Sequence, residues 1–209
     1  MRTTAAVKHS KEDFMKRMTK KRMSTETLVL GAILTALVII LQYLGQFIRL
    51  GPFSISLVLV PIVVGSAMCG TKVSTWLGFV FGIIVLMTDA TAFLAVSVAG
   101  TVITVLVKGA ACGFAAGLVY KLLKKFNLTV AAIVSAIVCP IVNTGVFLLG
   151  SAIFFLPSAD QIAAKIGLGV SGMAVFWALA MANFIFEISA SIVLSPVIVR
   201  LLEIRKKQK

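Results

Sequence analysis

The amino-acid sequence predicts an all-α membrane protein with six transmembrane helices, of which the second and third are short, and with both chain termini in the cytoplasm. Of its 209 residues, 60% are hydrophobic and only 13% are charged. With a mean hydropathy of +1.09, the chain has too little polar surface to cover a water-soluble domain of this length. The net charge of +13 comes from residues at the chain ends and between apolar runs. Because no basic patch interleaved with aromatic residues is present, we expect no nucleic-acid partner.

The first three apolar runs differ in length. The first predicted crossing, Thr27–Gln46, has 20 residues, enough to span about 30 Å of hydrocarbon. After an interruption at 49–52, the second and third runs are Phe53–Met68 and Val73–Met87, separated by four residues. Both are short for full crossings. They form a tight helical hairpin, or one of them is tilted, broken or re-entrant.

Three longer apolar runs complete the predicted bundle, and they are Thr101–Leu123, Val130–Leu156 and Met173–Leu202. The last two exceed the length of one straight crossing, so we expect them to be tilted. Pro140 and Pro196 lie inside these two runs. Because proline removes a backbone hydrogen bond from a helix, we expect a kink at each position.

The basic residues favour one side of this topology. With six crossings, 17 lysines and arginines fall on the side of both termini and only two, Arg49 and Lys165, on the other. The positive-inside rule makes the first side cytoplasmic. The chain then divides into a basic N-terminal tail at 1–26, a transmembrane domain at 27–202 and a basic C-terminal tail at 203–209.

Small residues recur at every fourth position on three of the predicted helices. Glycines occupy 109, 113 and 117 on the fourth helix and 78 and 82 on the third. This spacing lets two helix backbones approach closely, so we interpret both stripes as internal packing surfaces. Ala32 and Ala36 repeat the spacing on the first helix. For this pair the sequence leaves open whether the face packs internally or binds a partner protein.

A few polar side chains lie deep within the predicted helices, where they are costly and are expected to face a cavity or a polar partner. Lys108 is the only basic residue deep inside a crossing, because Lys121 and Arg200 lie near the predicted cytoplasmic ends of theirs. Thr104 shares the helix face of Lys108. Asn143 lies near the middle of the fifth crossing. In the sixth crossing, Asn183 and Glu187 are four residues apart and therefore lie on one face.

Two interpretations of these polar residues remain open. Lys108 and Glu187 form an ion pair that only holds helices together, or they line a pocket that opens to the outside and binds a small solute. In the second case Lys108 meets an anionic or strongly polar group, and the two asparagines, Glu187 and Thr104 complete the hydrogen bonding. Phe147 and Trp177 then form apolar walls, and Arg49 contributes to a lid. Asp89, which precedes the fourth helix, is expected to be a solvated loop carboxylate.

Motifs for catalysis and nucleotide binding are missing from the sequence, which has no GxxxxGK[ST] loop and no HExxH. Its only histidine, His9, lies in the N-terminal tail, and its three cysteines form no CxxC pair. We therefore expect no enzyme, no metal site and no cofactor. A self-sufficient carrier or channel that uses Glu187 as its ion-linked residue is one alternative, and an intramembrane enzyme is another. A small binding subunit that works with an energised partner fits better, because no internal inverted repeat is visible.

Several segments resemble the substrate-binding S components of energy-coupling factor (ECF) vitamin transporters. The resemblance covers roughly residues 28–202 and rests on the order and spacing of five motifs. They are Ala32-Ile-Leu-Thr-Ala36, FSISLVLVPIVVGSAMCG at Phe53–Gly70, LGFVFGIIVL at Leu77–Leu86, KGAACGFAAGLVYKLL at Lys108–Leu123 and CPIVNTGVFLLG at Cys139–Gly150.

The resemblance implies a function and a set of partners. An S component captures a water-soluble vitamin at the outer face of a prokaryotic cell membrane. It then docks on a transmembrane coupling subunit that is driven by two cytosolic ATPases, and the Ala32–Ala36 face is the implied docking contact. The segments at 53–86 and around Asn143 look most similar to pantothenate-type members and next to riboflavin-type members. Lys108 is a suitable counter-charge for the carboxylate of pantothenate, whereas an unpaired Glu187 would repel it.

Overall fold

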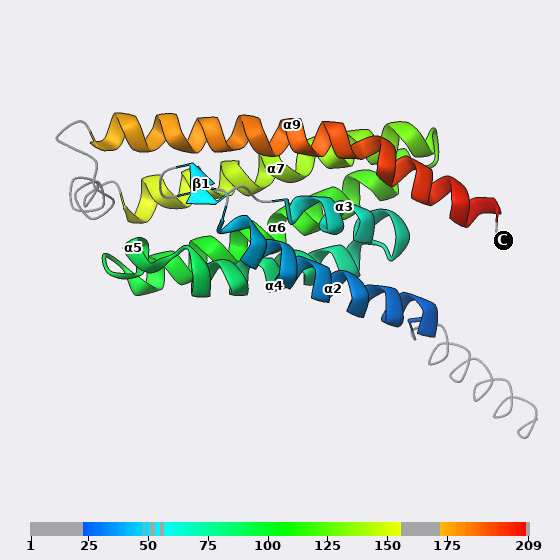
Figure 1. Cartoon of the computed structure of the whole chain (residues 1–209), viewed down its shortest axis with the longest axis horizontal. Coiled ribbons are helices and arrows are strands. Elements are labelled where there is room, and N and C mark those ends of the chain that lie inside the picture. Colours follow the sequence, from blue (N-terminus) through cyan, green and yellow to red (C-terminus); the bar gives the residue numbers. More distant parts are fainter. Residues whose placement is uncertain (1–22, 48, 51–52, 55–56, 156–171, 208–209) are drawn as a thin grey trace, which may run out of the picture.

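The computed structural model describes residues 23–47, 49–50, 53–54, 57–155 and 172–207. These residues form an elongated helical bundle whose long helices run roughly along one axis (Figure 1). The long helices are α2 (Thr25–Gly45), α4 (Thr71–Thr88), α6 (Val98–Leu123), α7 (Leu128–Phe154) and α9 (Gly172–Lys207). Each contains a stretch long and apolar enough to cross a membrane. The prediction of a multi-pass helical membrane protein is therefore confirmed, and five of the six predicted crossings have spanning length among the described residues.

The second predicted crossing is a shorter element than expected. Its helix, α3 (Leu59–Met68), has only ten residues, or about 15 Å at 1.5 Å per residue, which is half of the hydrocarbon thickness. The residues before it contribute to a two-stranded ribbon that the sequence analysis did not predict. In this ribbon β1 (Arg49–Leu50) pairs antiparallel with β2 (Phe53–Ser54). The apolar–polar alternation from Phe53 to Leu57 is typical of a strand, and a hydropathy average conceals it.

Polar side chains cap the N-termini of three of the long helices. The side chains of Ser24, Ser97 and Asn127 accept backbone N–H groups at the first turns of α2, α6 and α7. Gly70, with a φ of +88°, lies between α3 and α4 in a conformation that L-residues rarely adopt. Helix α4 has 18 residues and reaches spanning length, although the sequence predicted a short helix here. Pro196 lies inside α9, which changes direction towards its C-terminal end (Figure 1).

Helix α6 is the centre of the bundle and packs extensively against α4 and α7. On the α4 side the two glycine stripes meet. A Cβ added at Gly78 would collide with the carbonyl oxygen of Gly109, and one added at Gly113 would collide with that of Ser74. The Ser74 hydroxyl donates a hydrogen bond of 2.7 Å to the carbonyl of Gly113. The predicted internal packing of the glycine stripes is therefore confirmed.

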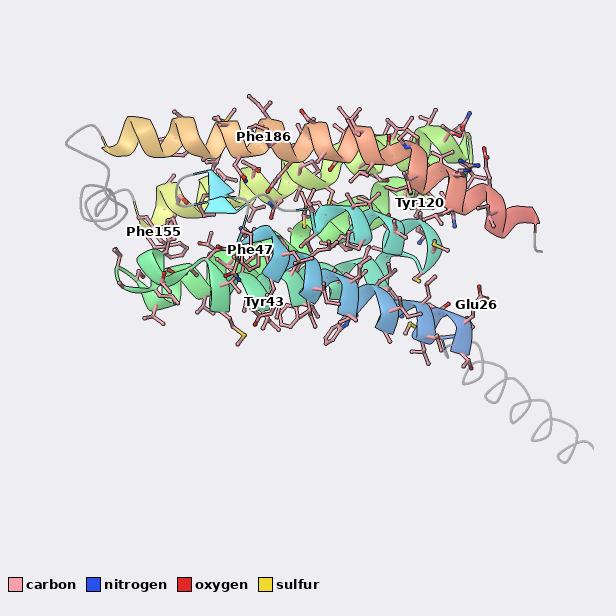
Figure 2. All side chains as sticks on the ribbon, in the orientation of Figure 1. Glu26, Tyr43, Phe47, Tyr120, Phe155 and Phe186 are labelled. Atoms are coloured by element: carbon pink, nitrogen blue, oxygen red, sulfur yellow. The ribbon has the colours of Figure 1, made fainter. Side chains whose placement is uncertain are left out.

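The outer faces of the bundle are apolar. Figure 2 shows side chains extending outward from the helices, among them Tyr43 and Phe186, which are 46% and 50% exposed. Large apolar side chains with this exposure on several helices are expected where lipid, not water, is the surrounding solvent. The start of α2 and the end of α9 lie at the same end of the bundle (Figure 1). This arrangement agrees with an even number of crossings, while the assignment of that end to the cytoplasm stays a prediction from the charges.

Candidate functional site: a polar pocket between the long helices

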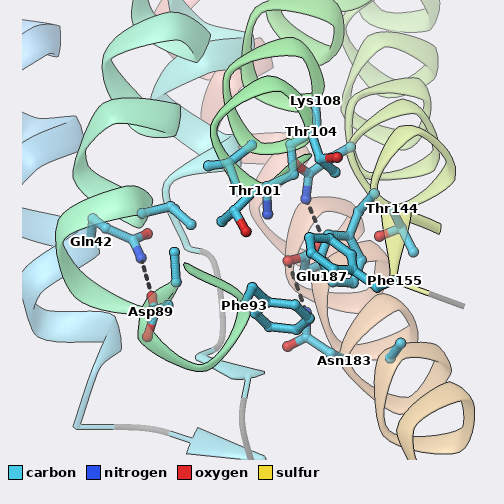
Figure 3. Close-up of a pocket in the computed structure, with 16 residues that line it drawn as sticks. Gln42, Asp89, Phe93, Thr101, Thr104, Lys108, Thr144, Phe155, Asn183 and Glu187 are labelled. Atoms are coloured by element: carbon cyan, nitrogen blue, oxygen red, sulfur yellow. Dashed lines mark hydrogen bonds between the residues drawn. The ribbon is translucent and has the colours of Figure 1, made fainter. Parts of the chain in front are cut away.

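A pocket opens between α2, α4, α6, α7 and α9, at the end of the bundle opposite to the start of α2 (Figure 3). The cavity has a volume of about 60 Å³ and is partly open to the surroundings. The four-residue helix α5 (Thr91–Leu94) contributes Phe93 to its lining. The pocket is therefore built where several helices end, and its walls come from segments far apart in the sequence.

The spacing of the polar residues along α6 and α9 places their side chains on the helix faces that line this pocket. On α6, Thr101, Thr104 and Lys108 are spaced at three and four residues and line it together. On α9, Asn183 and Glu187 do the same, and α7 contributes Asn143. The structure thus brings together all five polar residues that the sequence analysis assigned to a pocket on these three helices.

Glu187 is the most buried charged group of the pocket, with 2% of its surface exposed. One of its carboxylate oxygens accepts a hydrogen bond from Nδ2 of Asn143 at 3.4 Å, and the other accepts one from Nδ2 of Asn183 at 3.1 Å. These amide donors reduce the cost of holding a carboxylate away from water. They also join α7 to α9 beside the pocket.

Lys108 lies next to aromatic rings. Its Nζ is 5.1 Å from the centre of the Phe147 ring and 5.7 Å from that of Phe81, within the range of cation–π attraction. Glu187 and, more weakly, Asp89 act on the same ammonium electrostatically. Lys108 on α6 and Glu187 on α9 therefore line the same pocket, and the carboxylate is held by amides while the ammonium lies near phenyl rings.

An aromatic cluster closes one side of the pocket. Phe93 contacts Phe147 and Phe155 edge-on, with centroid distances of 5.8 Å and 5.4 Å. All three rings line the pocket. Trp177 packs against this cluster and is not among the residues that line the pocket. Arg49 lies in β1, and its side chain is outside the part of the chain that the structure describes.

The structure adds Asp89 and Gln42 to the site. Asp89 was expected to be a solvated loop residue, but it is only partly exposed and lines the pocket. Its Oδ2 accepts hydrogen bonds from Nε2 of Gln42 at 2.8 Å and from the hydroxyl of Thr88 at 3.2 Å. Gln42 is 1% exposed. A glutamine inside an apolar crossing is itself a signal of an internal polar partner, and that signal was present in the sequence.

The Ala32 and Ala36 side chains are exposed on the surface of α2, whereas Leu34 and Val38 of the same helix are buried in the bundle. Internal packing, one of the two interpretations left open for this pair, is therefore not what the structure shows. The two alanines form part of an outward apolar face.

Comparison with known proteins identifies one similarity. A family model described as "ECF transporter, substrate-specific component" matches residues 26–199. The match covers most of the chain and includes every residue of the pocket named above. No curated protein matches the chain, and no solved structure does.

Proposed function

Because the chain belongs to the substrate-specific components of ECF transporters, we propose that the pocket between α6, α7 and α9 is its binding site for a small water-soluble vitamin. Membership of the family makes the chain a substrate-binding transporter subunit in a membrane and not an enzyme. The binding site itself is our assignment. The single observation that carries it is the convergence of Lys108, Asn143 and Glu187, from three helices, on one pocket.

The pocket has the composition of a solute site. Aromatic rings form one side, and a small number of charged and amide groups form the other, a combination that orients a polar molecule while burying its apolar part. Pantothenate and riboflavin are the first solutes to test, because the sequence motifs are most similar to those branches. For pantothenate, Lys108 provides the cationic partner.

The position of the pocket supports capture from outside the cell. Both described chain ends lie at the opposite end of the bundle (Figure 1), and the excess of basic residues favours the cytoplasm for that end. We propose that the exposed Ala32–Ala36 face then docks on a transmembrane coupling subunit. Two cytosolic ATPases supply the energy in this scheme, so the chain itself needs no nucleotide site.

Thermal melting of the purified chain in detergent, without partner proteins, tests the binding site. A solute that binds only the folded state raises the melting temperature, and at 100 times its Kd it stabilises by about 2.7 kcal/mol. We expect at least one member of a panel of water-soluble vitamins to do so. Folded protein that responds to no vitamin would refute the proposal.

A further inference from the structure

Building on the proposed function, we propose that Glu187 is a positioning residue that fixes the amides of Asn143 and Asn183 as hydrogen-bond acceptors towards the pocket. The wall formed by α7 and α9 then binds N–H or O–H groups of the solute. The transported molecule is accordingly one that carries such donors, and a carboxylate or phosphate group of that molecule lies away from this wall.

The argument begins with the orientation of the two amides. An ionised carboxylate only accepts hydrogen bonds, so a neighbouring asparagine must turn its NH₂ group towards it. Both asparagines do so, each at a different oxygen of Glu187. The carboxylate therefore determines which end of each amide is left for another partner.

The remaining end of each amide is an unsatisfied acceptor. Within the part of the chain that the structure describes, Oδ1 of Asn143 and Oδ1 of Asn183 are buried and have no hydrogen-bond partner. Asn143 as a whole is only 4% exposed. Both residues line the pocket, and Asn183 is labelled in Figure 3. Buried amide oxygens without partners are costly, and a donor supplied by a bound solute would satisfy them.

The charged and polar groups around the two amides also favour a hydrogen-bond donor of the solute at the wall formed by α7 and α9. Glu187 adds negative charge directly behind the two amide oxygens, so an anionic group placed there would be repelled. Across the pocket, Lys108 and the Thr104 hydroxyl, both on α6, can donate, and among the described residues this hydroxyl has no hydrogen-bond partner. The pocket thus has an accepting wall on α7 and α9 and a donating wall on α6, which suits a solute with donors at one end and acceptors at the other.

Binding of matched solutes tests this inference. The probes are riboflavin, pantothenate, nicotinamide and thiamine, each compared with an analogue in which its N–H or O–H donors are methylated. We expect at least one parent to bind and its methylated analogue to bind at least tenfold more weakly, because a site built around a hydrogen bond rejects a molecule that lacks it. Equal binding of parent and analogue would overturn the inference. If none of the four parents binds, the inference fails, while the proposed function fails only if the wider vitamin panel gives no response.

A variant of Glu187 separates orientation of the amides from simple steric exclusion of a methyl group. In Glu187→Gln the side chain can donate as well as accept, so the asparagine amides are free to turn round. We expect the ratio of parent to methylated-analogue affinity to fall about tenfold. Glu203→Gln, the same change at an exposed position of α9, should leave the ratio unchanged. An unchanged ratio in Glu187→Gln would contradict the positioning role.

A second variant keeps the test decisive if Glu187→Gln does not fold. Asn183→Ala removes one of the two acceptors from a partly exposed position. We expect it to weaken binding of the parent solute about tenfold and to leave the methylated analogue unaffected. If binding of the parent and binding of the analogue weaken equally, the Asn183 amide oxygen does not accept a hydrogen bond from the solute.

Discussion

Replacing Gly82 by alanine tests whether the glycine contact between α4 and α6 sets the spacing of the pocket walls. An added Cβ would lie 2.9 Å from the carbonyl oxygen of Val105 and 3.2 Å from Cα of Leu106. Both neighbours are backbone atoms of α6, which cannot rotate away. The two helices would have to separate by about 0.5 Å for the first of these distances to reach the ordinary contact distance of 3.4 Å.

The expected loss of stability follows from two opposing effects. Overpacking of a well-packed interface costs about 1–3 kcal/mol, and alanine regains up to about 1 kcal/mol of helix propensity relative to glycine. Because the two closest neighbours are backbone atoms, the overpacking cost falls in the upper part of its range, at about 2–3 kcal/mol, and the net loss is about 1–2 kcal/mol. In a chain of this size that lowers the melting temperature by about 2–8 °C. The affinity for a bound vitamin should fall as well, since Val85 of α4 and Asp89, which directly follows α4, line the same pocket as Lys108 of α6.

The matched control is Gly145→Ala on α7, where an added Cβ meets nothing within 4 Å. Thermal melting in detergent should show a melting temperature for Gly145→Ala equal to or above that of the natural chain, and a lower one for Gly82→Ala. Equal melting temperatures for Gly82→Ala and the natural chain would refute the packing argument.

Three further substitutions test the pocket and the docking face. Lys108→Met should weaken binding of a solute that has an acceptor or anionic group by about 1 kcal/mol or more, measured by titration calorimetry, while Lys121→Met at an exposed site on the same helix should have no effect. The double change Ala32→Leu and Ala36→Leu should abolish uptake in cells but preserve solute binding by the purified chain, whereas Ala152→Leu, on an exposed part of α7, should preserve both; uptake that survives the double change would contradict the docking role. Gln42→Leu removes one donor from Asp89 and should lower the free energy of unfolding by about 1–3 kcal/mol, and unaltered thermal melting would show that the bond contributes little.

The membrane-spanning helices could be predicted from the sequence because a crossing depends on the composition and length of one continuous segment. Apolar runs of 20 or more residues have few alternatives to a helix in hydrocarbon, and α6, α7 and α9 were located to within a few residues at their described ends. The second run could not be assigned in this way. The second run joined the strand β2 to the ten-residue buried helix α3 in one apolar stretch, and only their packing distinguishes the two elements from a single crossing.

Site residues could be predicted when they are polar and lie inside an apolar helix. The helical spacing of such residues shows which side chains share a face. Lys108, Asn143 and Glu187 are of this kind. Asp89 follows α4 directly, and neither its neighbours in sequence nor its charge indicates that the chain folds back over the pocket. Its partner Gln42 lies 47 positions away, a separation that only the tertiary structure resolves.

The two halves of α6 explain how an apolar bundle tolerates a polar pocket. The first part of the helix carries Thr101, Thr104 and Lys108 towards the pocket, where space is unfilled and packing contacts are lost. The second part begins at Gly109, and its glycines let α4 approach backbone to backbone. Close packing of this kind is the main source of association between helices in a membrane, so the glycine half stabilises the bundle and the polar half is left available for a solute. A substitution that weakens the packing of α4 against the second part of α6 should therefore also weaken binding of a solute in the pocket, although the substituted residue does not line it.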